Sequence, residues 1–103
     1  MFTLEYLPTA RSDMIEIAKY IGQELGSPDA AQKLADDLVK AAERLVDFPY
    51  SCPVQHVSKH LKNEYRKLVV KNYAMFYWVD ETKKKIVIAR VIYSRRDYQN
   101  FLQ

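Results

Sequence analysis

The spacing of apolar residues changes once along this chain, and the change limits the folds that are open to it. Between residues 9 and 48, apolar side chains recur every three or four positions, which is the spacing of one face of an α-helix. From Tyr65 to Tyr93 they alternate or form short continuous runs, which is typical of strands. The sequence therefore predicts a helical part followed by a part that forms a sheet.

Two helices are predicted in the first part. The first has Thr9 as its expected N-cap and ends at Gly26. Its apolar face consists of Met14, Ile17, Ala18, Ile21 and Leu25. The second has Ser27 as its expected N-cap and Pro28 at its first helical position. Its apolar face consists of Ala31, Leu34, Ala35, Leu38, Ala42 and Leu45. The short connection makes the two helices an antiparallel hairpin.

Strands complete the predicted fold. They are expected at residues 2–7, 65–71, 73–79 and 86–93, and a short helical turn is expected at residues 95–102. This order predicts an α+β fold with an N-terminal strand, a two-helix antiparallel hairpin, a three-stranded antiparallel meander and a short C-terminal helix. The hairpin should cover one face of the sheet and leave the other partly open as a binding surface. A chain of 103 residues gives one domain, residues 1–103.

Several kinds of site are not expected. The apolar and aromatic run at residues 73–79 is far shorter than the roughly 20 residues that cross a bilayer, so we expect no membrane span and a cytoplasmic location. A single cysteine, Cys52, cannot form an internal disulfide. His56 and His60 have no apparent third ligand near them, and no glycine-rich phosphate loop is present. We therefore expect neither a metal nor a cofactor.

Charge is distributed unevenly along the chain. The net charge is +3, but residues 1–58 carry five cations against nine carboxylates, a sum of −4. Residues 59–96 carry eleven cations against three carboxylates, a sum of +8. This asymmetry indicates a polyanionic partner facing the second half, with a solvated basic surface as the alternative.

Cations and aromatic side chains are interleaved in the basic half. They are Lys67, Lys71, Tyr73, Tyr77, Arg90, Tyr93, Arg95, Arg96 and Tyr98. Cations neutralise phosphates and rings stack on unpaired bases, so the mixture suits single-stranded RNA, although the signal is nonspecific. Met75 and Phe76 are instead predicted to lie in the core. Arg66 is expected to anchor the sheet through Glu64 or Asp97, with a functional contact as the alternative.

Groups of residues along nearly the whole chain resemble the RelE/ParE superfamily of toxins. They are Ala10-x-x-Asp13, Tyr20-Ile21, Ala30-Ala31, Leu45 with Pro49, Arg66-x-Leu68-x-Val70, Asn72-Tyr73, Phe76-Tyr77 and the run from Val91 to Asp97. Their order matches the predicted strand, hairpin and meander. The resemblance implies a growth-inhibiting toxin of a type II toxin–antitoxin system, which a cognate antitoxin neutralises by wrapping around it.

The resemblance also implies two alternative mechanisms. RelE-type members cleave mRNA in the ribosomal A site with lysines, arginines and a tyrosine, whereas ParE-type members inhibit DNA gyrase. Of five RelE-type positions, Lys67 and Arg96 keep suitable chemistry. The other three positions are occupied by Val69, Ala74 and Leu102. Tyr98 is the nearest substitute for the tyrosine that Leu102 replaces. If the alignment is shifted by one residue, Arg66 and Leu68 occupy the two lysine positions instead.

The incomplete set favours a ParE-like inhibitor of gyrase. The first alternative is a RelE-like mRNA endoribonuclease, and the second is a nontoxic RNA-binding domain on the same fold. In the RelE-like version, Lys67 would assist proton transfer, Arg96 would stabilise the transition-state phosphate, and Tyr98 would stack on a base or act as an acid.

Further contacts are expected with the target and with the antitoxin. Lys71, Arg90 and Arg95 are expected to bind the target, which is either the ribosome with its mRNA or gyrase. An acidic antitoxin segment is expected to cover the basic sheet and to pair with an exposed strand or with the helical hairpin.

Overall fold

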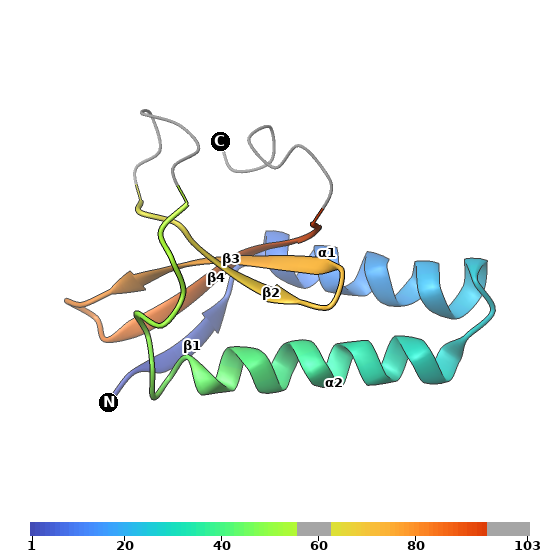
Figure 1. The fold of residues 1–103 in the computed structure, drawn as a ribbon, viewed down its shortest axis with the longest axis horizontal. Helices are drawn as coiled ribbons and strands as arrows, with labels where there is room; N and C mark the ends of the chain where they lie inside the picture. Colours follow the sequence, from blue (N-terminus) through green and yellow to red (C-terminus); the bar gives the residue numbers. More distant parts are fainter. Residues whose placement is uncertain (56–62, 95–103) are drawn as a thin grey trace.

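The computed structural model describes residues 1–55 and 63–94, and their chain forms a four-stranded sheet with a helical hairpin on one face (Figure 1). The elements are β1 (Thr3–Tyr6), α1 (Pro8–Lys19), a π-helical turn η1 (Tyr20–Glu24), α2 (Pro28–Arg44), β2 (Arg66–Val70), β3 (Tyr73–Asp80) and β4 (Lys85–Tyr93). The α+β class and the helical hairpin are as predicted. The C-terminal helix predicted at residues 95–102 lies outside the described residues.

The sheet is mixed, with the strand order β1-β4-β3-β2. Strands β2, β3 and β4 form the predicted antiparallel meander. Strand β1 lies parallel to β4, with Thr3 opposite Lys85 and Tyr6 opposite Ile88. The prediction of a three-stranded meander was therefore incomplete, because the N-terminal strand joins it as a fourth, parallel strand. A parallel pair needs a long crossover connection, and the helical hairpin is part of that connection.

The two helices begin in different ways. Helix α1 begins at Pro8 with Leu7 at the N-cap position, so the prediction of Thr9 as N-cap was wrong. The Thr9 hydroxyl instead donates to the backbone oxygen of Ala89, 2.8 Å away in β4. Helix α2 begins as predicted, with Ser27 at the N-cap position and Pro28 at the first helical position.

Between the helices, the chain turns at Gly26. This residue has a φ of 66°, a left-handed conformation that favours glycine. Before it, the Leu25 N–H donates to the Tyr20 oxygen at 3.0 Å, the five-residue spacing of a π-helical turn. The predicted end of the first helix is therefore a π-helical turn, followed by a glycine that reverses the chain.

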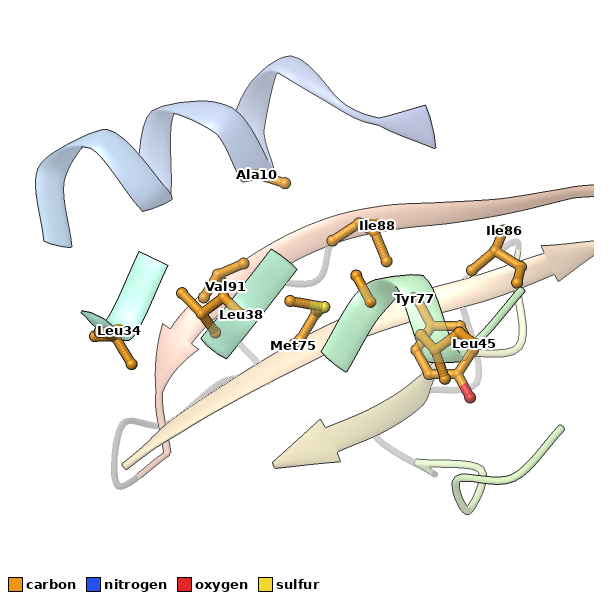
Figure 2. Close-up of a cluster of buried hydrophobic side chains, with 10 residues drawn as sticks. Ala10, Leu34, Leu38, Leu45, Met75, Tyr77, Ile86, Ile88 and Val91 are labelled. Carbon is orange, nitrogen blue, oxygen red and sulfur yellow. The ribbon is translucent and has the colours of Figure 1, made fainter. Parts of the chain in front are cut away.

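The hydrophobic core lies between the hairpin and the sheet. Figure 2 shows Leu34, Leu38 and Leu45, from α2 and its C-terminal end, facing side chains of β3 and β4. The strand residues in this cluster are Met75, Tyr77, Ile86, Ile88 and Val91. Each fully buried leucine contributes about 2 kcal/mol to folding relative to an exposed one. The predicted apolar face of the second helix thus supplies the core.

The opposite face of the sheet, which we call the second face, carries the residues that alternate with this cluster. They are Lys67, Val69, Ala74, Phe76, Trp78, Val87, Arg90 and Ile92. Phe76 is fully buried, and Ala74, Val87 and Ile92 are buried too. The expectation of a partly open second face was therefore wrong for β3 and β4. Strand β4 is a nearly continuous apolar run, which is typical of a strand buried on both faces.

One buried hydroxyl has no hydrogen-bond partner in the described structure, that of Tyr6 on β1. Burial, with a smaller effect from Glu43, raises its pKa. Because an unpaired buried hydroxyl costs free energy, Tyr6→Phe should raise the free energy of unfolding by about 1 kcal/mol in urea denaturation. The matched control is Tyr77→Phe, which removes a hydroxyl that donates to the Pro49 oxygen at 2.9 Å and should lower stability. Equal losses in both variants would contradict the prediction.

Candidate functional site

Three of the six predicted site residues fall in the described structure. Lys67 lies on β2, Lys71 in the turn between β2 and β3, and Arg90 on β4. The other three, Arg95, Arg96 and Tyr98, lie outside the described residues. The site must therefore be built from the surroundings of the first three.

Lys67 lies on the second face, in the same cross-strand row as Phe76 and Arg90. Its cross-strand partner is Phe76, and its backbone N–H donates to the Pro53 oxygen at 3.2 Å. Next to it on this face, Val69 is 54% exposed and is paired with the buried Ala74. Those are two of the positions at which RelE-like chemistry would place cations. Along this part of β2 and β3, Lys67 therefore lies beside apolar side chains of the second face.

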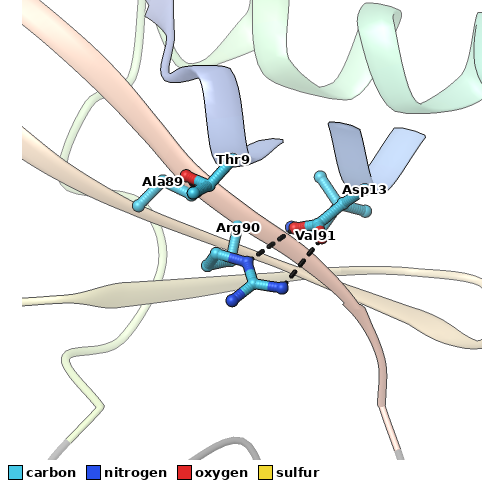
Figure 3. A network of polar contacts seen from close by, with 5 residues as sticks. All are labelled: Thr9, Asp13, Ala89, Arg90 and Val91. Carbon is cyan, nitrogen blue, oxygen red and sulfur yellow. Dashed lines mark hydrogen bonds and ion pairs between the residues drawn. The ribbon is translucent and has the colours of Figure 1, made fainter. Parts of the chain in front are cut away.

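Arg90 is held by a carboxylate of the first helix. Its Nε and one terminal nitrogen donate to the two oxygens of Asp13, each at 2.8 Å (Figure 3). The hydrogen bond to Asp13 is the main cause that raises the pKa of Arg90. Both side chains are largely buried. Such a two-pronged pair fixes geometry as well as charge, so Arg90 joins α1 to the sheet. Its predicted contact with a target stays a prediction.

The same carboxylate completes the edge of β4. Strand β1 ends at Tyr6, opposite Ile88, whereas β4 continues to Tyr93. Beyond that point, the Val91 N–H donates to Asp13 at 2.9 Å, and the Ala89 oxygen accepts from Thr9. Side chains of α1 thus take over from β1 as hydrogen-bond partners of β4. Figure 3 shows Thr9 and Asp13 of α1 beside this part of β4.

Lys71 is also paired with a carboxylate. Its ammonium lies 3.0 Å from Asp37 of α2, and Lys33 lies 3.6 Å from the other oxygen of the same carboxylate. The hydrogen bond from Lys71 is the main cause that lowers the pKa of Asp37. Lys71 has a φ of 56°, which is unusual for a residue with a side chain. Its side chain remains about half exposed, so this pair is open to solvent and to partners.

The unequal charge of the two halves has a partial explanation inside the fold. Three ion pairs each join a cation of the basic half to a carboxylate of the acidic half. They are Arg90 with Asp13, Lys71 with Asp37, and Lys85 with Glu5 at 3.0 Å. Part of the +8 segment is therefore neutralised by the chain itself, which weakens charge asymmetry as an argument for a polyanionic partner.

Arg66 lies in a network that holds the segment before the sheet. Its guanidinium donates to the Cys52 oxygen at 2.6 Å and lies 5.0 Å from the ring centre of Tyr50. Glu64 lies 3.7 Å away, and the Tyr50 hydroxyl donates to Glu81. The predicted Glu64 partner is therefore present, whereas Asp97 lies outside the described residues. These contacts support the structural interpretation of Arg66.

Tyr20 and Tyr50 were not proposed as site residues, although both are exposed aromatic side chains. Tyr20 does not lie on the predicted apolar face of the first helix, and this position indicates that its side chain is exposed. For Tyr50 no pattern was available, because it lies in an irregular segment between two prolines. Rings at such positions are partner-contact candidates.

Neither a metal centre nor a membrane span emerges from the described residues. In residues 1–55 and 63–94, no three His, Cys, Asp or Glu side chains come together as metal ligands. No helix in this part of the chain is long and apolar enough to cross a bilayer.

Comparisons with known proteins relate this fold to two toxin–antitoxin systems. Residues 4–98 match the family described as the ParE toxin of the type II toxin–antitoxin system parDE. No curated protein is significantly similar to the sequence. A chain of the chromosomal ParDE TA system from P. aeruginosa superposes with a TM-score of 0.72 and 21% identity, covering 90% of this chain and 96% of that one. A chain of the toxin–antitoxin complex RelBE2 from Mycobacterium tuberculosis superposes with a TM-score of 0.62 and 19% identity, covering 89% of this chain and 96% of that one.

Proposed function

Because the chain belongs to the ParE toxin family of type II toxin–antitoxin systems, we propose that it inhibits growth by acting on DNA gyrase and is neutralised by a cognate antitoxin. The observation that carries the proposal is the family match, which extends from residue 4 to residue 98 and so includes β2, β3, β4 and all of β1 except Thr3. The similarity in fold to chains of ParDE and RelBE2 systems supports an antitoxin as partner.

The surroundings of Lys67 support gyrase over mRNA as the target. Cleavage of RNA without a metal needs several cations around the phosphate, because charge develops there in the transition state. Next to Lys67 on the second face, Val69 and Ala74 are apolar. Lys71 and Arg90, the other described candidates, are paired with carboxylates. This arrangement suits a binding surface better than a catalytic one.

RelE-like cleavage of mRNA is the second candidate function. The fold similarity to a chain of the RelBE2 complex favours it, together with Lys67 and the sequence positions of Arg96 and Tyr98. In that case Lys67→Ala should reduce cleavage about 100-fold or more, as expected when a group that stabilises or protonates the transition state is lost.

The deciding experiment measures both activities with one purified protein. We expect inhibition of DNA supercoiling by gyrase and intact mRNA on programmed ribosomes. Lys83→Ala is the matched control for Lys67→Ala, because Lys83 is an exposed lysine in the turn between β3 and β4. Cleaved mRNA with unaffected supercoiling would replace the gyrase proposal with the RelE-like one. Unchanged growth on expression without an antitoxin would remove both and leave the nontoxic RNA-binding domain.

A further inference from the structure

Three tyrosines, two from the sheet and one from the helical hairpin, lie beside the turn between β2 and β3. Tyr73 and Tyr93 are opposite each other in register, and their rings lie edge to face with centres 5.7 Å apart. Tyr20, in η1, is 53% exposed, and Tyr93 is 39% exposed. Figure 1 shows this turn beside the helical hairpin, whose helices extend past it. We call Tyr20, Lys71, Tyr73 and Tyr93 the tyrosine–lysine surface.

The hydroxyls of this surface are available to a partner. None of the three tyrosines makes a side-chain hydrogen bond within the described residues, although Tyr50 and Tyr77 elsewhere do. Burial, followed by the nearby Tyr20 and Tyr93 hydroxyls, raises the pKa of Tyr73, so its hydroxyl remains a donor. Exposed rings with unused donors suit a partner that offers both apolar surface and acceptors.

Lys71 supplies the positive charge of this surface, and its present partner can be exchanged. Asp37 is bound by Lys33 as well as by Lys71, so departure of Lys71 would leave the carboxylate with a cation. Exposed ion pairs are weak, so breaking the Lys71–Asp37 pair costs little free energy. The left-handed backbone of Lys71 costs free energy that glycine would avoid. The Lys71 side chain therefore stabilises the fold only through its exposed ion pair with Asp37.

We propose that the tyrosine–lysine surface binds a segment of the cognate antitoxin that presents a carboxylate between apolar side chains. Lys71 exchanges Asp37 for that carboxylate, and the tyrosine hydroxyls donate to acceptors of the same segment. A protein segment fits better than a nucleic acid because it can present a single carboxylate to Lys71, whereas a phosphate backbone would bring several negative charges close to Asp37. The inference rests on the proposed function, since it presumes an antitoxin.

The test uses the product of the reading frame next to this chain's gene, purified after it restores growth of cells expressing the chain. Titration calorimetry should show binding about fivefold weaker for Lys71→Gly, because the pair formed inside the interface is less screened by solvent and outweighs the exposed Asp37 pair that it replaces. The control is Lys84→Gly, in the turn between β3 and β4. Lys84 has a φ of 55° and a carboxylate partner, Glu81, so the change removes the same charge and the same strain. Its affinity should equal that of the parent.

A second variant tests the hydroxyls while keeping the rings. Tyr20→Phe combined with Tyr93→Phe should weaken binding about tenfold, as for two lost hydrogen bonds. Unchanged affinity in Lys71→Gly, or equal losses in Lys71→Gly and Lys84→Gly, would overturn the inference while growth arrest and rescue uphold the proposed function. An oligothymidine that binds the parent and fails to bind Lys71→Gly would reassign the surface to nucleic acid. A chain that arrests no growth would end both proposals.

Discussion

Replacing Asp13 with alanine should lower the free energy of unfolding by about 3 kcal/mol, the range for breaking a largely buried, hydrogen-bonded ion pair. The change removes three hydrogen bonds at once, two from Arg90 and one from the Val91 N–H. It removes the Asp13 acceptor from the Arg90 guanidinium and from the Val91 N–H at the edge of β4. Urea denaturation followed by the fluorescence of Trp78, the single tryptophan, measures the loss.

Two further variants separate the ion pair from other effects of the change. Glu24→Ala removes an exposed carboxylate from the adjoining turn η1 and should alter stability by less than about 0.5 kcal/mol. Adding Arg90→Ala to Asp13→Ala completes a double-mutant cycle, in which the coupling energy should exceed about 1.5 kcal/mol. A cycle with no coupling would mean that Asp13 stabilises the fold only through Val91 and that Arg90 is open to another role.

The local pattern of the sequence was enough to predict the elements but not all of their partners. Leu34, Leu38 and Leu45 lie on the predicted helix face and are buried against the sheet. Strand β1 was also recognised, but four residues of alternating character do not specify which strand they pair with. Its parallel position beside β4 depends on how the whole hairpin packs, which no local pattern contains.

The site was harder to predict because its ion pairs are distant in sequence. Arg90 and Asp13 lie 77 positions apart, so the sequence counted each as an uncompensated charge of its own half. The same holds for Lys71 with Asp37. Composition measures how many charges a segment carries, whereas only the fold decides which of them meet. The basic half consequently presents less positive charge to a partner than its net charge of +8 suggests, because some of its cations are paired with carboxylates of the acidic half.

Arg66→Ala should lower the free energy of unfolding by about 2 kcal/mol, through one charge-assisted hydrogen bond and one cation–π contact. The Arg66 side chain is 16% exposed, and its guanidinium holds the Cys52 oxygen and the Tyr50 ring against the start of β2. Arg66→Lys should recover less than half of the loss, because an ammonium cannot reproduce a planar group that bonds and stacks at once. Urea denaturation of the three proteins measures both changes.

Growth inhibition by the same variants distinguishes a structural from a functional Arg66. If its role is structural, inhibition should follow the folded fraction and return to the parental level where Arg66→Ala is fully folded. Lys83→Ala, which removes an exposed lysine from the turn between β3 and β4, should leave both stability and inhibition unchanged. Loss of inhibition in a fully folded Arg66→Ala would instead make Arg66 a target contact, and its contacts with Cys52 and Tyr50 would then orient it for that contact.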